Sequence, residues 1–158
     1  MEIKKIVIIT LLDLKGFGVK SVNNFLFQCR DNFPSNSEEL YEKLMDGRKV
    51  VNKVELLESW DRAEKISEIA REQEIDIISY GEDTFPKTLK QIDDCPPILY
   101  AKGNLELLNK KSVAVIGSRN HSEEASKITK DYTKELIKKG YVIVSGLAKG
   151  IDTIAHQT

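Results

Sequence analysis

The sequence predicts an α/β protein: an all-helical domain over residues 1–74, then the first part of a parallel-sheet domain over residues 75–158. Two observations carry this prediction. Before residue 75, apolar residues recur at helical spacing, whereas after it short β-branched runs end at glycines and lead into helical patterns. A chain of 158 residues is long enough for one large domain or two small ones.

The first helices are predicted from the segment around Gly16-Phe17-Gly18. Residues 3–14 fit either a helix or a strand by periodicity alone. The Gly-x-Gly turn, followed by Val22, Phe25 and Leu26 at helical spacing, favours a helix-hairpin-helix. Such a hairpin either contacts a DNA backbone through its N–H groups or serves only packing.

Two further helices complete the predicted helical domain. The first covers residues 37–45, with Ser37 as its N-cap and Gly47 at its end. The second runs from about residue 53 to 74, and its Trp60 is expected in the core.

Short strands are predicted over residues 75–80, 98–101, 112–116 and 141–145, because each is an apolar, mostly β-branched run bounded by turn residues. A helix over 120–139 joins the last two strands, capped by Asn120 or Ser122 and followed by Gly140. Its expected buried stripe is Ala125, Ile128, Tyr132, Leu136 and Ile137.

Two glycine turns are the candidate functional site. A strand–helix–strand crossover makes its two strands parallel, so Gly117 and Gly146 end their strands at the same edge of one sheet. Glycine permits close backbone approach, and the following helix starts offer N–H groups to an anion. Arg119 adds a bidentate fork and Lys149 a point charge. The candidate anion-binding residues are Gly117, Ser118, Arg119, Ser145, Gly146, Lys149 and Gly150.

Acidic residues near the turns have a different expected role. A carboxylate repels phosphate, so Asp152 is expected to cap the helix that begins at Ile151 or to orient Lys149 or Arg119. Glu123 and Glu124 compete with a phosphate at the start of the preceding helix.

Charge and motifs exclude several classes of protein. Net charge is −1, but residues 110–158 hold nine Lys/Arg against five Asp/Glu, which places the basic part beside the turns. Neither a dinucleotide fingerprint nor a P-loop is present, and no residue cluster predicts catalysis, a metal or a cofactor.

No apolar run approaches the roughly 20 residues of a membrane span. Cys29 and Cys95 are isolated, as expected of reduced thiols in a cytoplasmic protein.

Four segments occur in one order: Phe85-Pro86-x-x-Leu89, then residues 97–103, residues 113–119, and residues 145–152 followed by Ala155-His156. Together they resemble the bacterial DNA-processing protein A family, called DprA or Smf. The resemblance implies an extended Rossmann-like domain that binds single-stranded DNA without catalysis, behind a sterile-alpha-motif-like (SAM-like) helical domain. It also implies protection of incoming DNA in natural transformation (competence), loading of the RecA recombinase for DNA recombination, and a homodimer.

Within this resemblance, Arg119 matches the arginine of the family's Gly-Ser-Arg motif, and residues 145–150 match its second DNA-contacting loop. Lys149 stands where many members have arginine, so the charge is kept and the bidentate fork is lost. Residues 120–125 depart from the Tyr-Gly that many members carry there. The chain is expected to be an N-terminal fragment that lacks the rest of the Rossmann-like domain and any winged helix. Because its sheet would expose an edge and an apolar face, it is expected to self-associate or to be only marginally stable.

Two other functions stay open from the sequence. One is a nucleotide-binding or nucleotide-hydrolysing enzyme with a related Rossmann-like fold, whose Pro-Gly-Gly-x-Gly-Thr-x-x-Glu motif would fall after Thr158. The other is a protein-interaction domain in which the helices of residues 1–74 recruit a partner.

Overall fold

The computed structural model describes residues 2–47 and 50–158. The chain forms two compact units, one ending at Leu105 and one from Glu106 to Thr158. Each unit is treated by itself below.

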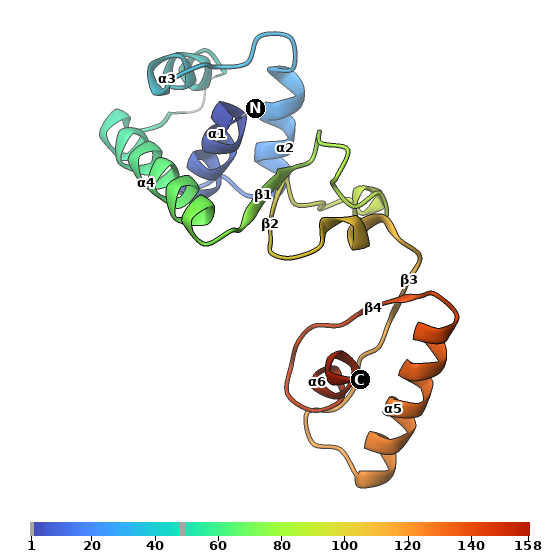
Figure 1. The fold of residues 1–158 in the computed structure, drawn as a ribbon. Helices are drawn as coiled ribbons and strands as arrows, with labels where there is room; N and C mark the ends of the chain where they lie inside the picture. Colours follow the sequence, from blue (N-terminus) through green and yellow to red (C-terminus); the bar gives the residue numbers. More distant parts are fainter. Residues whose placement is uncertain (1, 48–49) are drawn as a thin grey trace. The chain divides into compact units, whose positions relative to one another are not determined.

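Four helices make up most of the first unit: α1 (Glu2–Asp13), α2 (Val19–Gln28), α3 (Ser37–Asp46) and α4 (Lys53–Glu72) (Figure 1). The first of these settles the ambiguity of residues 3–14 in favour of the helix. Gly16 in the α1–α2 turn has φ +87°, a left-handed conformation that glycine adopts without strain. The predicted helix-hairpin-helix is therefore present.

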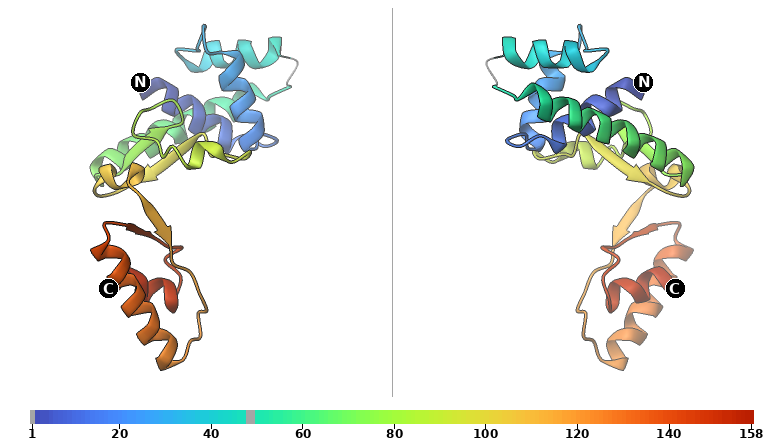
Figure 2. Two further views of the ribbon diagram at one scale, coloured as in Figure 1. Left: turned by 90° about the vertical axis from the view of Figure 1, so that its right-hand side faces the viewer. Right: turned by 90° about the vertical axis from the view of Figure 1, so that its left-hand side faces the viewer.

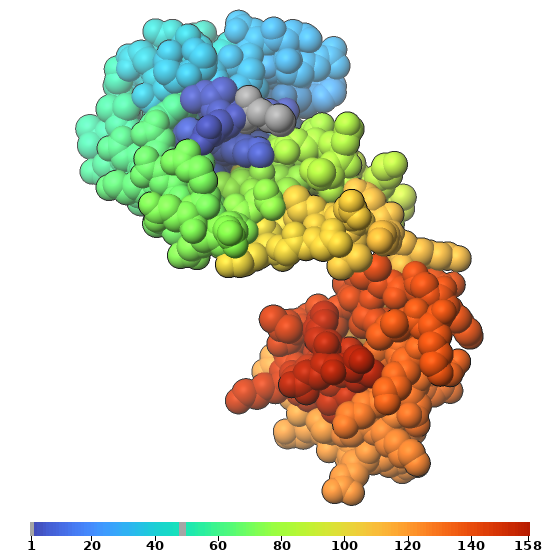
Figure 3. Space-filling model, in the orientation of Figure 1, coloured from blue at the N-terminus to red at the C-terminus, as the bar shows by residue number. Residues whose placement is uncertain are grey.

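Helix α1 is the centre of this unit's core. Its residues 7–11 are all buried, and α4 packs along it. In the space-filling view the blue atoms of α1 lie between the light-blue and green atoms of the neighbouring helices (Figure 3). Trp60 of α4 is buried in this core, as predicted. Phe17 of the hairpin is partly buried and packs against the same core. The most deeply buried apolar side chains of the four helices are Val7, Ile8, Leu11, Val22, Leu40, Leu44, Leu56 and Ala63.

The N-cap of α3 is Asn36, and the prediction of Ser37 was wrong. Asn36 has an extended backbone, and its side-chain oxygen accepts the Glu39 amide at 2.9 Å. Ser37 is already helical, so the polar residue one position earlier takes the cap. The helix ends at Gly47, as predicted.

A two-stranded antiparallel sheet also belongs to the first unit. Strand β1 (Asp76–Ser79) pairs with β2 (Ile98–Ala101), with Asp76 opposite Ala101 and Ser79 opposite Ile98. Both strands lie where the sequence predicted them. The connection between them contains a short 3₁₀ turn (Leu89–Gln91) and the fully buried Phe85.

The second unit is a strand–helix–strand–helix arrangement. Strand β3 (Ser112–Ala114), helix α5 (Glu123–Lys138), strand β4 (Val142–Val144) and helix α6 (Ile151–Gln157) follow a 3₁₀ turn at Leu105–Asn109. β3 and β4 pair in parallel, with Ser112 opposite Val142 and Ala114 opposite Val144. Helix α5 contacts both β4 and α6, and the two helices are neighbours in each view of Figure 2. The predicted α/β class, with helices first and a small parallel sheet second, is confirmed.

The buried face of α5 differs from the predicted one. Ile128, Tyr132 and Ile137 are 49%, 70% and 47% exposed, whereas Thr129 and Thr133 are buried. Helix α5 packs mainly against β4 and the short α6, and its buried residues are Thr129 and Thr133. Apolar residues at the flanks of the contact therefore stay in solvent. Ser122 caps the helix by accepting the Ala125 amide, and Gly140 follows it with φ +79°, both as expected.

No helix within residues 2–47 and 50–158 is long and apolar enough to cross a membrane.

Cys29 and Cys95 are both buried and form no disulfide, and burial raises the pKa of each thiol.

Asp13 connects the end of α1 to α4. Its Oδ2 atom accepts hydrogen bonds from the Ser59 hydroxyl at 2.8 Å and from the Arg62 guanidinium at 2.7 and 2.9 Å. These bonds, first that of Ser59 and then those of Arg62, lower the pKa of Asp13. The stabilisation is therefore complete above the ordinary carboxyl pKa of about 3.9 and is lost as pH falls through the lowered value.

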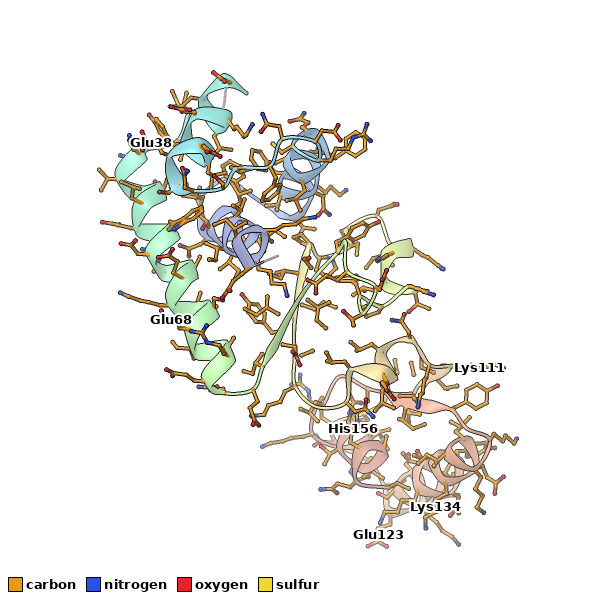
Figure 4. The ribbon with its side chains drawn as sticks, turned by 45° about the horizontal axis from the view of Figure 1, so that its top comes forward. Glu38, Glu68, Lys111, Glu123, Lys134 and His156 are labelled. Atoms are coloured by element: carbon orange, nitrogen blue, oxygen red, sulfur yellow. The ribbon has the colours of Figure 1, made fainter. Side chains whose placement is uncertain are left out.

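We expect Asp13→Asn to reduce the free energy of unfolding by about 1 kcal/mol at pH 7, because the amide keeps one acceptor but loses the charge, and Arg62 is half exposed. The difference from wild type should shrink as pH falls below the ordinary carboxyl pKa of about 3.9. Urea unfolding followed by fluorescence of Trp60, the single tryptophan, measures both values. Glu68→Gln, on the exposed side of α4 (Figure 4), is the control and should change neither. A pH-independent loss would contradict the assigned role of the carboxylate.

Candidate functional site

The two glycine turns lie side by side at the carboxyl ends of β3 and β4. We call residues 116–121 the first turn and residues 145–150 the second turn. The hydrogen bonds between β3 and β4 continue up to the start of the turns, because the Val115 amide donates to the Val144 carbonyl at 2.9 Å. The Ser145 hydroxyl then donates to the Val115 carbonyl at 2.7 Å. The predicted placement of both turns at one edge of a parallel sheet is confirmed.

Two glycines allow the turns to interlock. Gly150 has φ +93°, and a Cβ atom there would lie 2.3 Å from the Ser118 carbonyl oxygen and 2.7 Å from Arg119 Cα. A Cβ atom on Gly117 would lie 2.8 Å from Ile151 Cβ. Ile151 also donates its amide to the Ser118 carbonyl at 3.2 Å. The sequence assigned these glycines to close approach by a ligand, but in the structure Gly150 is in close contact with the first turn and Gly117 with the first residue of α6.

Asp152 ties the two turns together. Its Oδ1 atom accepts the Gly117 amide at 3.2 Å, and its Oδ2 atom accepts the Gly146 amide at 3.1 Å. The side chain is 6% exposed. Burial acts to raise the pKa of Asp152, but hydrogen bonds from Gly117 and from the second turn outweigh it and lower the pKa. The carboxylate is therefore the stable form at neutral pH.

This role of Asp152 differs from both predicted ones. Gly150 is the N-cap residue of α6, and no side chain caps that helix. Among the residues that the structure describes, Asp152 forms no ion pair with Arg119 or Lys149. Sequence reasoning missed its true partners because one of them, Gly117, is 35 positions away.

The two predicted cations are exposed and unpaired. Neither the Arg119 guanidinium nor the Lys149 ammonium makes a hydrogen bond or ion pair with any residue in the ranges 2–47 and 50–158. Arg119 lies two positions after Gly117, and Lys149 directly precedes Gly150. An anion can therefore contact both side chains without displacing a partner among the described residues.

Four other predicted site residues have a hydroxyl or an amide that is already hydrogen-bonded within the protein. The Ser118 hydroxyl donates to the Asn120 carbonyl and accepts the Asn120 amide at 3.2 Å. The Ser145 hydroxyl and the amides of Gly117 and Gly146 have the partners given above. The structure thus brings the seven predicted residues together. Five of them shape and hold the turns, and the other two, Arg119 and Lys149, extend cationic side chains into solvent.

The start of α5 is satisfied by local hydrogen bonds. His121 Nδ1 lies 2.8 Å from the Ser126 hydroxyl, so this side chain has a local partner at the start of the helix. Glu123, labelled in Figure 4, and Glu124 occupy the exposed first turn of the helix. No group of three or more metal-binding side chains occurs in the described part of the chain.

The structure also shows a feature that the sequence did not suggest. Leu147 has φ +56°, although it carries a branched side chain, and it is 76% exposed. A non-glycine residue between Gly146 and Gly150 gives no signal of such a backbone.

We expect Asp152→Asn to loosen both turns, because an amide offers one acceptor oxygen and turns its NH2 group toward the second amide donor. Amide hydrogen exchange by NMR should then speed up roughly tenfold or more at Gly117 and Gly146. Asp131→Asn on the exposed side of α5 removes the same charge and should leave both rates unchanged. Equal protection in Asp152→Asn and wild type would show that the carboxylate does not hold the turns.

The family model for "DNA recombination-mediator protein A" matches residues 76–158, more than half of the chain. Among curated proteins, DNA processing protein DprA of Bacillus subtilis (strain 168) is 37% identical over 105 residues, which are 66% of this chain and 35% of that protein. DNA processing protein DprA of Streptococcus pneumoniae is 45% identical over 84 residues, 53% of this chain and 29% of that protein. The matched region thus covers about a third of these relatives' length.

A solved structure extends the similarity to the helical part. The X-ray structure of DNA processing protein A from Streptococcus pneumoniae aligns with 99% of this chain and 50% of its own chain, with a TM-score of 0.63 and 29% identity. The expected fold is therefore confirmed over both parts. The domain boundary near residue 75 agrees with the start of the family match but not with the division of the compact units at Leu105, and it stays a prediction. On the family match and these relatives, the chain belongs to the DNA recombination-mediator protein A family, the DprA/Smf proteins.

Proposed function

We propose that this chain supplies a binding surface for single-stranded DNA to a protein of DNA processing and recombination. The observation that carries the proposal is the pair of exposed cations, Arg119 and Lys149, which have no partner among the described residues and lie on two closely packed turns at one sheet edge. Family membership supports DNA as the anion.

The proposed contacts are made by side chains. Arg119 offers a planar fork that binds two oxygens of one phosphate, and Lys149 offers a compact charge to a second phosphate. The amides of Gly117 and Gly146 donate to Asp152, so they contribute by holding the turns and not by contacting the strand. Binding of this kind depends steeply on salt, because each neutralised phosphate releases counterions.

The wider activities are proposals, because the matched region covers only about a third of the length of the curated relatives. They are protection of incoming DNA in natural transformation, loading of the RecA recombinase, homodimer formation and a cytoplasmic location, all without catalysis. The name of the matched family, a recombination mediator, supports a recombinase partner.

We expect Arg119→Ala to weaken binding of a fluorescein-labelled oligothymidylate roughly tenfold at low salt, measured by fluorescence anisotropy. The slope of log affinity against log salt should fall by about 0.7, the contribution of one phosphate on a single strand. Lys134→Ala on α5 (Figure 4) removes an exposed cation outside the turns and is the control. Equal affinities of wild type and Arg119→Ala across the titration would refute the role of Arg119. Displacement of the oligonucleotide by stoichiometric ATP would instead favour the nucleotide-binding enzyme.

A further inference from the structure

Leu147 is held in a backbone conformation that its side chain disfavours. In the left-handed region the Cβ atom crowds the adjacent carbonyl, so only glycine, asparagine and aspartate adopt it readily. Leu147 adopts it at φ +56°. Since 76% of the residue is exposed, burial within this chain does not offset the strain.

Hydrogen bonds on both sides of Leu147 fix this conformation. On one side the Gly146 amide donates to Asp152 at 3.1 Å. On the other side the Ala148 carbonyl accepts both the amide of Thr153 at 3.2 Å and its hydroxyl at 2.8 Å. The second turn would tolerate glycine at position 147 better than leucine, so the apolar side chain has no evident role inside the fold.

The surroundings of Leu147 combine apolar and cationic groups. Ile116, which directly precedes Gly117 in the first turn, is 75% exposed. Arg119 and Lys149, both unpaired among the described residues, belong to the same two turns. A ligand that matches this surface carries anionic groups next to flat apolar ones. A single DNA strand does so, since its unstacked bases expose apolar faces beside the phosphates.

We propose that Leu147 is a base-contacting residue: its side chain packs on the face of an unstacked base whose flanking phosphates are held by Arg119 and Lys149. The inference rests on the proposed binding of single-stranded DNA and assigns the base contact to an aliphatic side chain. An aliphatic contact makes no hydrogen bonds to base edges, so it discriminates little between bases and favours strands whose bases are unpaired.

The test compares Leu147→Gly and Leu147→Ala with wild type on two fluorescent strands of equal length, oligothymidylate and an abasic strand that keeps the phosphates. Both variants should bind oligothymidylate about five- to tenfold more weakly, because the apolar contact is lost. Both should bind the abasic strand like wild type. The midpoint of thermal unfolding of Leu147→Gly, measured by circular dichroism, should not fall, because glycine relieves the strained backbone.

Several outcomes overturn the inference. These are unchanged binding of oligothymidylate, equal losses on both strands, or a lower unfolding midpoint for Leu147→Gly, which would place the side chain among the supports of the fold. Dissociation of an oligomer by either variant, seen by light scattering, would assign Leu147 to a contact between copies of the chain.

The same measurements separate this inference from the proposed function. If wild type binds neither strand, the proposed function fails. If wild type binds both and Arg119→Ala weakens both, while Leu147→Gly weakens neither, the proposed function stands and only the base contact is refuted.

Discussion

The paired turns depend on one carboxylate, that of Asp152. It accepts an amide from each turn, and it does so in a site that is nearly closed to water. Backbone amides need an acceptor, and those of Gly117 and Gly146 point here at the same place. The carboxylate accepts a hydrogen bond from both amides and so fixes the first turn, the second turn and α6 relative to one another. Because Arg119 and Lys149 belong to these turns, the same bonds fix the positions of their backbone atoms.

The glycines of the motif follow from the same constraint. Asp152 can reach both amides only if the turns approach closely, and that approach leaves no room for a Cβ atom at Gly117 or Gly150. The left-handed φ of Gly150 adds a second reason at that position. A motif that resembles a ligand-binding loop in sequence is thus also a packing motif. The positions that face outward, Leu147 and Lys149, are those that the packing does not determine.

The sequence predicted the parallel pairing and the meeting of both turns, because β-branched runs, terminal glycines and a crossover helix specify these features locally. It did not predict the partners of Asp152, since a hydrogen bond across 35 residues depends on the assembled fold. The stripe of α5 was predicted from periodicity, which identifies an apolar face but not what covers it. The cap of α3 was missed by one residue because Asn36 and Ser37 both have suitable side chains, and only the backbone conformation distinguishes them.

The use of the amides by Asp152 also bears on the kind of anion that the site prefers. Proteins that bind a mononucleotide commonly hold its phosphate with backbone N–H groups of a glycine turn. Here the amides of Gly117 and Gly146 already have an anionic acceptor that belongs to the protein. These two amides are therefore not available to a phosphate, and the exposed side chains of Arg119 and Lys149 each make only a weak contact with one phosphate. On the proposed function, affinity comes from several phosphates bound in series, together with the exposed apolar side chains beside them. An arrangement of that kind favours a single strand over a free nucleotide or a duplex whose bases are stacked inside.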